Sequence, residues 1–121
     1  MTIRTLENKS DHDKMVVAMA RKFEAEGMFV KADHIGHRNG QPNMVYGHIP
    51  DVEAVLNNKK ILAEAETQDT FDNPETKNQF VAFSRADAEF HVIVPKECLD
   101  EIKRKAAGWG VTVNQYWTME V

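Results

Sequence analysis

Two neighbouring apolar segments carry acids at positions where buried strands normally hold Val, Ile or Leu. The first, "IPDVEAVL", places Asp51 directly after Pro50, and the second, "KILAEAET", places Glu64 and Glu66 two residues apart. The "NNKK" sequence between them supplies turn residues, so the two segments are expected to form a β-hairpin. Because burying an unpaired charge is unfavourable, this hairpin must either expose its acids or neutralise them.

The spacing of the acids favours neutralisation. Side chains two residues apart on a strand share a face, so Glu64 and Glu66 are expected to point the same way, with Asp51 across the hairpin from Glu64. Carboxylates this close repel one another and raise one another's pKa unless a cation lies between them. Oxygen-rich clusters suit hard ions such as Mg²⁺ or Mn²⁺. The hairpin therefore predicts a divalent-metal site on a sheet.

Hydrophobic periodicity predicts the elements around the hairpin. Apolar residues at helical spacing indicate a first helix over residues 10–26, and a capping pattern around Pro74 starts a second. "EFHVIVP" is typical of an interior strand covered on both faces. We expect an α/β chain with a mixed sheet flanked by helices, in the order αβββαβαβ. The expected strands cover residues 28–36, 44–56, 60–70, 89–95 and 111–121, and the later helices cover residues 69–86 and 95–110.

Length and composition predict one soluble domain over residues 1–121. Apolar residues make up 42% of the chain, but no apolar run approaches the ~20 residues that a membrane span needs. The polar N-terminus argues against a secretory signal, and the lone Cys98 suits a reducing compartment, so a cytoplasmic location is expected. A formal net charge of -4 argues against non-specific binding to a phosphate backbone.

The hairpin and the order of its flanking elements resemble the PD-(D/E)XK nuclease superfamily, which has the restriction-endonuclease-like fold. "IPDVEAV" resembles the strand with the family's first acid, and "ILAEAET" resembles the strand with its second acid. The resemblance covers roughly residues 11–112. It implies that Asp51 and Glu64 hold Mg²⁺ or Mn²⁺, and that the metal activates water for phosphodiester cleavage.

One position departs from the family pattern. Glu66 stands where the family has a Lys that assists catalysis, and a carboxylate cannot supply that cation. Some family members carry the Lys on the next helix, which makes Lys77 the candidate here, with Gln79 as a lesser one. The expected catalytic set is therefore Asp51, Glu64, Glu66 and Lys77. Family members also tend to carry an acid on the first helix, where Asp13 and Glu24 are weak substitutes.

The resemblance implies a metal-dependent nuclease acting on nucleic acid, with DNA favoured over RNA. A homodimer is expected, because family members commonly cut both strands of a duplex as symmetric pairs. The alternative is a domain of the same fold that no longer cuts and that binds nucleic acid or protein. The missing Lys and the acidic net charge favour this alternative.

Structural explanations stay open for the same residues. Asp51 is also a common turn residue after Pro, and Glu64 and Glu66 suit the solvent face of an edge strand. His34, His37 and His48 are candidate ligands of an alternative transition-metal site. Arg38, Lys59 and Lys60 are candidates to flank the cleft and contact phosphates. His12 lies on the apolar stripe of the first helix and is expected to be a satisfied or half-exposed helix residue.

Overall fold

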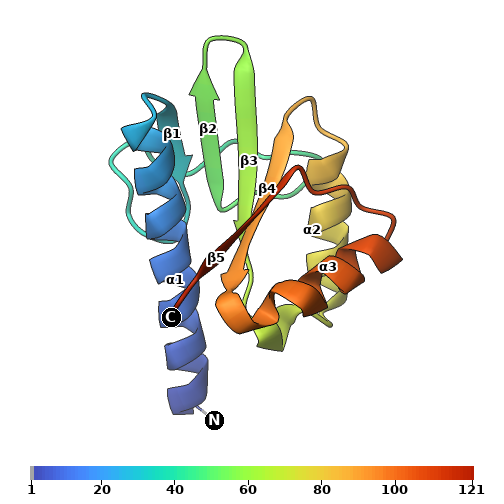
Figure 1. The fold of residues 1–121 in the computed structure, drawn as a ribbon. Helices are drawn as coiled ribbons and strands as arrows, with labels where there is room; N and C mark the ends of the chain where they lie inside the picture. The colour runs from blue at the N-terminus through green and yellow to red at the C-terminus, as the bar shows by residue number, and fades with distance from the viewer. Residues whose placement is uncertain (1) are drawn as a thin grey trace.

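The structure is a computed structural model that describes the backbone of residues 2–121 and the side chains of residues 11–121. It contains a five-stranded mixed sheet flanked by helices, as the sequence predicts (Figure 1). In chain order the helices and strands are α1 (Thr2–Ala25), β1 (Phe29–Ala32), β2 (Val52–Leu56), β3 (Lys59–Ala65), α2 (Pro74–Ser84), β4 (Glu89–Pro95), α3 (Leu99–Gly108) and β5 (Gln115–Met119). Short 3₁₀ turns at Gln68–Thr70 and Lys96–Cys98 precede α2 and α3.

The strands lie in the sheet in the order in which they occur in the chain, from β1 to β5. β1 pairs with β2 and β2 with β3 in antiparallel fashion, whereas β3 pairs with β4 and β4 with β5 in parallel. Parallel neighbours need crossover connections, and α2 and α3 supply them. β3 is therefore the central strand, antiparallel to one neighbour and parallel to the other.

The sheet separates two hydrophobic cores. α1 packs on one face, where Phe23 and Met15 meet Ile61 and Ala63 of β3. The helices α2 and α3 cover the other face, and Figure 1 shows them across the sheet from α1. The largest buried side chains of this second core are Leu62, Phe71, Phe80, Phe83, Phe90 and Ile102. Burying one such side chain contributes about 1.5–3 kcal/mol.

β3 alternates between the two faces, which decides where its acids point. Ile61, Ala63 and Ala65 face α1, and Leu62 packs in the opposite core. Glu64 follows Leu62 by two residues and shares its face. Glu64 thus points away from α1, and Glu66 follows directly after the end of the strand.

Several predicted boundaries are wrong. α1 begins at Thr2 rather than at residue 10, so Ser10 lies inside the helix. Residues 2–10 contain no Pro or Gly, so nothing in their backbone chemistry ends the helix there. Their polar composition concealed the helix, because it gives no apolar period. β3 ends at Ala65 and β5 covers only Gln115–Met119.

The predicted second strand is also too long, since β2 begins at Val52 and not at residue 44. Val45 and His48 form an isolated bridge around Tyr46 and Gly47, whose φ angles are 49° and 84°. Two successive positive φ angles make a tight turn that no regular strand can contain. Asp51 is therefore the residue just before β2 and not a residue within it.

Among the described residues, no helix is both long and apolar enough to cross a lipid bilayer.

Candidate functional site

An open pocket of about 390 Å³ lies where β2 begins and β3 ends. Its lining comes from α1, from the segments after β1 and before β2, from the end of β3 and the turn that follows it, and from α2 with its N-cap. The ionisable and amide side chains that line it are His12, His34, Asp51, Glu64, Glu66, Asp69, Asn73, Glu75 and Gln79. The lining is therefore polar and strongly acidic, and it lies at the opposite end of the hairpin from the turn at Asn57 and Asn58.

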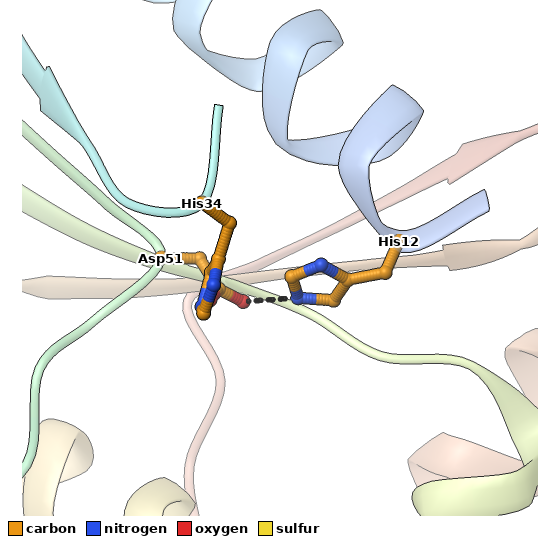
Figure 2. A group of neighbouring side chains, drawn as sticks. All are labelled: His12, His34 and Asp51. Atoms are coloured by element: carbon orange, nitrogen blue, oxygen red, sulfur yellow. Dashed lines mark hydrogen bonds and ion pairs between the residues drawn. The ribbon is translucent and has the colours of Figure 1, made fainter. Parts of the chain in front are cut away.

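Two histidines converge on the carboxylate of Asp51 (Figure 2). Nε2 of His12 lies 3.2 Å from Oδ2 of Asp51, and Nε2 of His34 lies 3.4 Å from Oδ1. The two imidazole rings meet edge to face, with centroids 5.2 Å apart. One ligand atom from each of the three residues lies within 4.8 Å of the others, so they form a group that can hold a metal ion.

Backbone contacts fix Asp51 at the end of the hairpin. The amide of Ala65 donates a hydrogen bond of 2.9 Å to Oδ2 of Asp51, which ties the carboxylate to the end of β3. The amide of Asp33 donates a bond of 2.9 Å to the carbonyl of Asp51, which ties the same residue to the end of β1. Asp51 is only 5% exposed. Its position is thus set by three strands and not by its own side chain alone.

The backbone at His34 is left-handed, with a φ of 72°. Such a conformation is unfavourable for a residue with a Cβ, and here it is supported by Asp33, whose Oδ1 accepts a bond of 2.9 Å from the amide of His34. His34 follows the end of β1 by two residues, and its imidazole points toward Asp51, as Figure 2 shows. The segment after β1 therefore contributes a site residue from a single strained position.

A second carboxylate orients His12. Nδ1 of His12 lies 3.2 Å from Oδ1 of Asp13, while Nε2 faces Asp51. An imidazole held through one ring nitrogen presents the other in a fixed direction. Asp13 and Asp51 thus hold the ring from its two ends.

Glu64 is the least satisfied group of the pocket. The residue is 3% exposed, and its Oε1 atom is buried without a hydrogen-bond partner among residues 11–121. Burial, together with the charges of Asp51 and Glu66, raises the pKa of Glu64 well above its ordinary value. A buried carboxyl oxygen without a partner is unfavourable unless a proton or another cation reaches it.

Glu66 is 6% exposed and accepts a hydrogen bond from the hydroxyl of Thr70. Burial raises the pKa of Glu66 to about 8, and the charge of Asp51 adds to the rise, although the Thr70 hydroxyl partly opposes it. Glu64 and Glu66 both hold protons more tightly than ordinary glutamates do. The pocket therefore binds protons at positions where a divalent cation could bind instead.

The histidines and Asp51 shift one another's pKa in opposite directions. Burial alone would raise the pKa of Asp51, but hydrogen bonds from His12 and His34 hold it well below its usual range. Burial alone would lower the pKa of His12, but Asp51 and Asp13 together raise it to about 9. A hydrogen bond to Asp51 raises the pKa of His34 as well. Both histidines thus hold a proton more tightly because they face the same aspartate.

The structure brings Asp51, Glu64 and Glu66 into one pocket, but it does not bring Lys77 there. Lys77 is exposed and does not line the pocket, whereas Gln79 does. α2 begins at Pro74, and its buried positions Thr76, Phe80 and Phe83 turn Lys77 outward. The prediction that the ammonium of Lys77 reaches the acids is wrong in this structure, and Gln79 occupies the side of the helix that faces them.

Two of the three histidines in the predicted transition-metal site lie elsewhere. Nε2 of His37 lies 3.2 Å from Oε2 of Glu24, and the ring of His48 packs edge to face on Phe83. Neither residue lines the pocket. Only His34 of that set reaches the acids.

The cations expected to flank the site pair with other acids. Arg38 contacts Glu24 at 2.9 Å, Lys59 contacts Glu89 at 3.5 Å, and Lys60 contacts Glu53 at 3.2 Å. Lys59 and Lys60 begin β3, at the far end of the hairpin from the pocket. None of the three cations lines the pocket.

His12 is the site residue that sequence reasoning missed. It precedes the buried residues Met15, Val16 and Met19 by three, four and seven positions, so it lies on the inward face of α1. This spacing was visible in the sequence. The second signal was the residue next to His12, Asp13, which is a candidate substitute for the family's acid on the first helix.

No family model, curated protein or solved structure matches this chain. The resemblance to the nuclease superfamily therefore stays a prediction from the sequence.

The donor set of the pocket fits a divalent cation. Asp51 and Glu64 offer carboxylate oxygens, one of them without a partner, and His12 and His34 offer ring nitrogens. Oxygen and imidazole ligands together are typical of first-row divalent metal sites. The residues present can hold the metal that the nuclease resemblance implies.

Proposed function

We propose that this protein is a metal-dependent phosphodiester hydrolase that acts on nucleic acid and has a restriction-endonuclease-like fold. One observation carries the proposal: Asp51, Glu64 and Glu66 are buried side by side in an open pocket, and Oε1 of Glu64 has no partner. Buried carboxylates arranged in this way destabilise a fold unless a cation neutralises them.

Asp51 and Glu64 would hold Mg²⁺ or Mn²⁺ between the two strands of the hairpin. When bound there, a divalent cation makes water a stronger nucleophile and neutralises the charge that develops on the phosphate. Asp51 is suited to this role because Ala65 fixes its carboxylate and because it stays ionised at every physiological pH. Glu66, held by Thr70, would add a ligand or orient water.

The polar side chain that α2 presents to this site is Gln79. Its amide group can donate a hydrogen bond to a phosphate oxygen, which is part of what the missing Lys would do. It cannot supply a positive charge.

We propose DNA as the preferred substrate, cut by a homodimer. β1 and β5 are the two edges of the sheet, and an edge strand can pair with a second copy of the chain. The prediction is a dimer in analytical ultracentrifugation, and a monomer would remove this part of the proposal.

A panel of single-stranded, duplex, nicked and branched DNA and RNA, with Mn²⁺ or Mg²⁺, tests the activity. The wild type is expected to cleave at least one substrate, and Glu64→Gln is expected to abolish cleavage. Glu53→Gln is the matched control, because Glu53 is a buried glutamate of the same hairpin that does not line the pocket. Equal cleavage by wild type and Glu64→Gln would show that the site assignment is wrong.

A second function is favoured by one specific observation. Within residues 11–121, neither Lys nor Arg lines the pocket. A domain that binds nucleic acid or protein without cutting needs no catalytic cation there. In that case metal binding and partner binding persist while no substrate in the panel is cleaved, and a partner complex survives Glu64→Gln.

A further inference from the structure

We propose that His12 and His34 are metal ligands and that they make the site select Mn²⁺, or another first-row transition metal, over Mg²⁺. This inference rests on the proposed function to the extent that it needs a divalent cation at Asp51 and Glu64. It goes beyond that function because the nuclease resemblance supplies only the two carboxylates.

The ring nitrogens are already directed at one point. Nε2 of His12 faces Oδ2 of Asp51, and Nε2 of His34 faces Oδ1 of the same carboxylate. The two residues come from different elements, α1 and the segment after β1, and their rings meet at 81° (Figure 2). Two imidazole nitrogens and the carboxylate on which they converge offer three ligand atoms to a single ion.

The support behind His12 is the kind that metal ligands have. A histidine ligand usually donates its other ring N–H to a carboxylate, which fixes the tautomer and the ring orientation. Nδ1 of His12 lies 3.2 Å from Oδ1 of Asp13, which leaves Nε2 for the pocket. Asp13 is thus the carboxylate that would accept the second ring N–H of His12 and hold the ring in place.

Ion pairing alone does not explain the whole pocket. If the two histidines served only to neutralise Asp51, the neighbouring Oε1 of Glu64 would remain buried and unpartnered. A cation held by the two nitrogens and by Asp51 would lie in the pocket that Glu64 also lines. It would bring positive charge to a pocket in which the ion pairs leave that oxygen unpartnered.

Nitrogen donors determine which ion such a site prefers. Mg²⁺ strongly favours oxygen ligands and keeps much of its water, whereas imidazole suits Mn²⁺ less than the later first-row metals but better than it suits Mg²⁺. Two imidazoles beside two carboxylates should therefore favour Mn²⁺ over Mg²⁺ by at least about tenfold in affinity.

The test is the electron spin-echo spectrum of Mn²⁺ bound to the metal-free wild-type protein, combined with calorimetric titration of Mn²⁺ and Mg²⁺. We expect modulation from directly bound imidazole nitrogen in the wild type. It should weaken in His34→Asn and disappear in the double variant His12→Asn and His34→Asn. The double variant should also lose most of the preference for Mn²⁺.

His48→Asn is the matched control, since it removes an imidazole that packs on Phe83 outside the pocket. It should keep the wild-type spectrum and affinities. The wild-type spectrum alone is decisive if a variant does not fold, because it requires no substitution.

The outcomes separate this inference from the proposed function. Mn²⁺ that binds without nitrogen coupling, and that is lost in Glu64→Gln, would overturn the histidine ligands and leave the carboxylate metal site in place. Absence of Mn²⁺ binding to the wild type would overturn both. Nitrogen coupling without any cleavage would support the ligand set and count against the hydrolase.

Discussion

Nε2 of His12 lies 3.2 Å from Oδ2 of Asp51, which joins α1 to the start of β2 across 39 positions of the chain. The contact holds a helix to the sheet at the edge of the pocket. It also makes the stability of the metal-free protein depend on pH.

The free energy of unfolding of the metal-free protein should decrease as the pH rises from about 6.5 to about 9. His12 has a pKa of about 9 in the folded state, so its contribution is complete below 6.5 and is lost as the pH rises through 9. Glu66, with a pKa of about 8, acts in the same direction above 4.5. Asp51, whose pKa is lowered, contributes above 3.8 and loses its contribution as the pH falls.

Urea unfolding in the presence of a chelator, repeated over this pH range, checks the prediction. Maximum stability is expected in mildly acidic solution. A free energy of unfolding that is constant or rises toward pH 9 would contradict the pKa directions of His12 and Glu66.

Glu64→Gln should stabilise the metal-free protein while removing its metal binding. The substitution keeps the shape of the side chain but removes an ionisable carboxyl that burial and two neighbouring acids disfavour. At alkaline pH we expect the melting temperature to rise by about 2–8 °C, which corresponds to about 1 kcal/mol. The stabilisation that Mn²⁺ gives the wild type should be absent.

Glu53→Gln provides the comparison for this prediction. Its carboxylate lies 3.2 Å from Nζ of Lys60, so the substitution removes a favourable contact and should not raise the melting temperature. It should retain the Mn²⁺ effect. A melting temperature that falls in Glu64→Gln would show that this carboxyl stabilises the fold.

Asp13→Asn should weaken Mn²⁺ binding without abolishing it. Loss of a carboxylate behind a histidine ligand lowers metal affinity by about 10-fold to 100-fold. Asp11→Asn is the control on the same helix, because Asp11 pairs with Lys14 at 4.0 Å and does not contact His12 in the described contacts. Calorimetric titration of Mn²⁺ into the two variants measures both affinities. Equal affinities would show that Asp13 does not support His12 as a metal ligand.

Gln79→Ala and Lys77→Ala should differ in cleavage rate if the protein is a hydrolase. Gln79 lines the pocket and can donate to a phosphate oxygen, so its loss should lower the rate by at least about tenfold. Lys77 is exposed and outside the pocket, so its loss should change the rate less than about twofold. A large loss in Lys77→Ala would restore the lysine to the catalytic set.

Asn73→Ala should lower the free energy of unfolding by about 1 kcal/mol. Oδ1 of Asn73 accepts a hydrogen bond of 2.9 Å from the amide of Glu75 and caps α2 beside the pocket. Asn78→Ala, at an exposed position inside the same helix, should change stability by less than about 0.5 kcal/mol. Chemical denaturation measures both, and equal effects would argue against the cap.

The sequence alone predicted the mixed sheet with flanking helices and the common pocket of Asp51, Glu64 and Glu66. These are properties of short range: the strand period of two fixes which residues of β3 share a face, and the short connection fixes which strand lies opposite. The predicted start of the second strand was wrong because Tyr46 and Gly47 form a tight turn with positive φ angles.

Only the tertiary structure decided which other side chains reach the acids. His12 lies in the pocket because α1 packs across the sheet, and His34 lies there because its left-handed backbone turns the chain just after β1. No local sequence pattern encodes the distance between the two residues. Lys77 and Gln79 are two residues apart on α2, yet the buried face of the helix places only Gln79 in the pocket. The sequence determined where the negative charge lies, and the packing of the helices on the sheet determined which groups meet it.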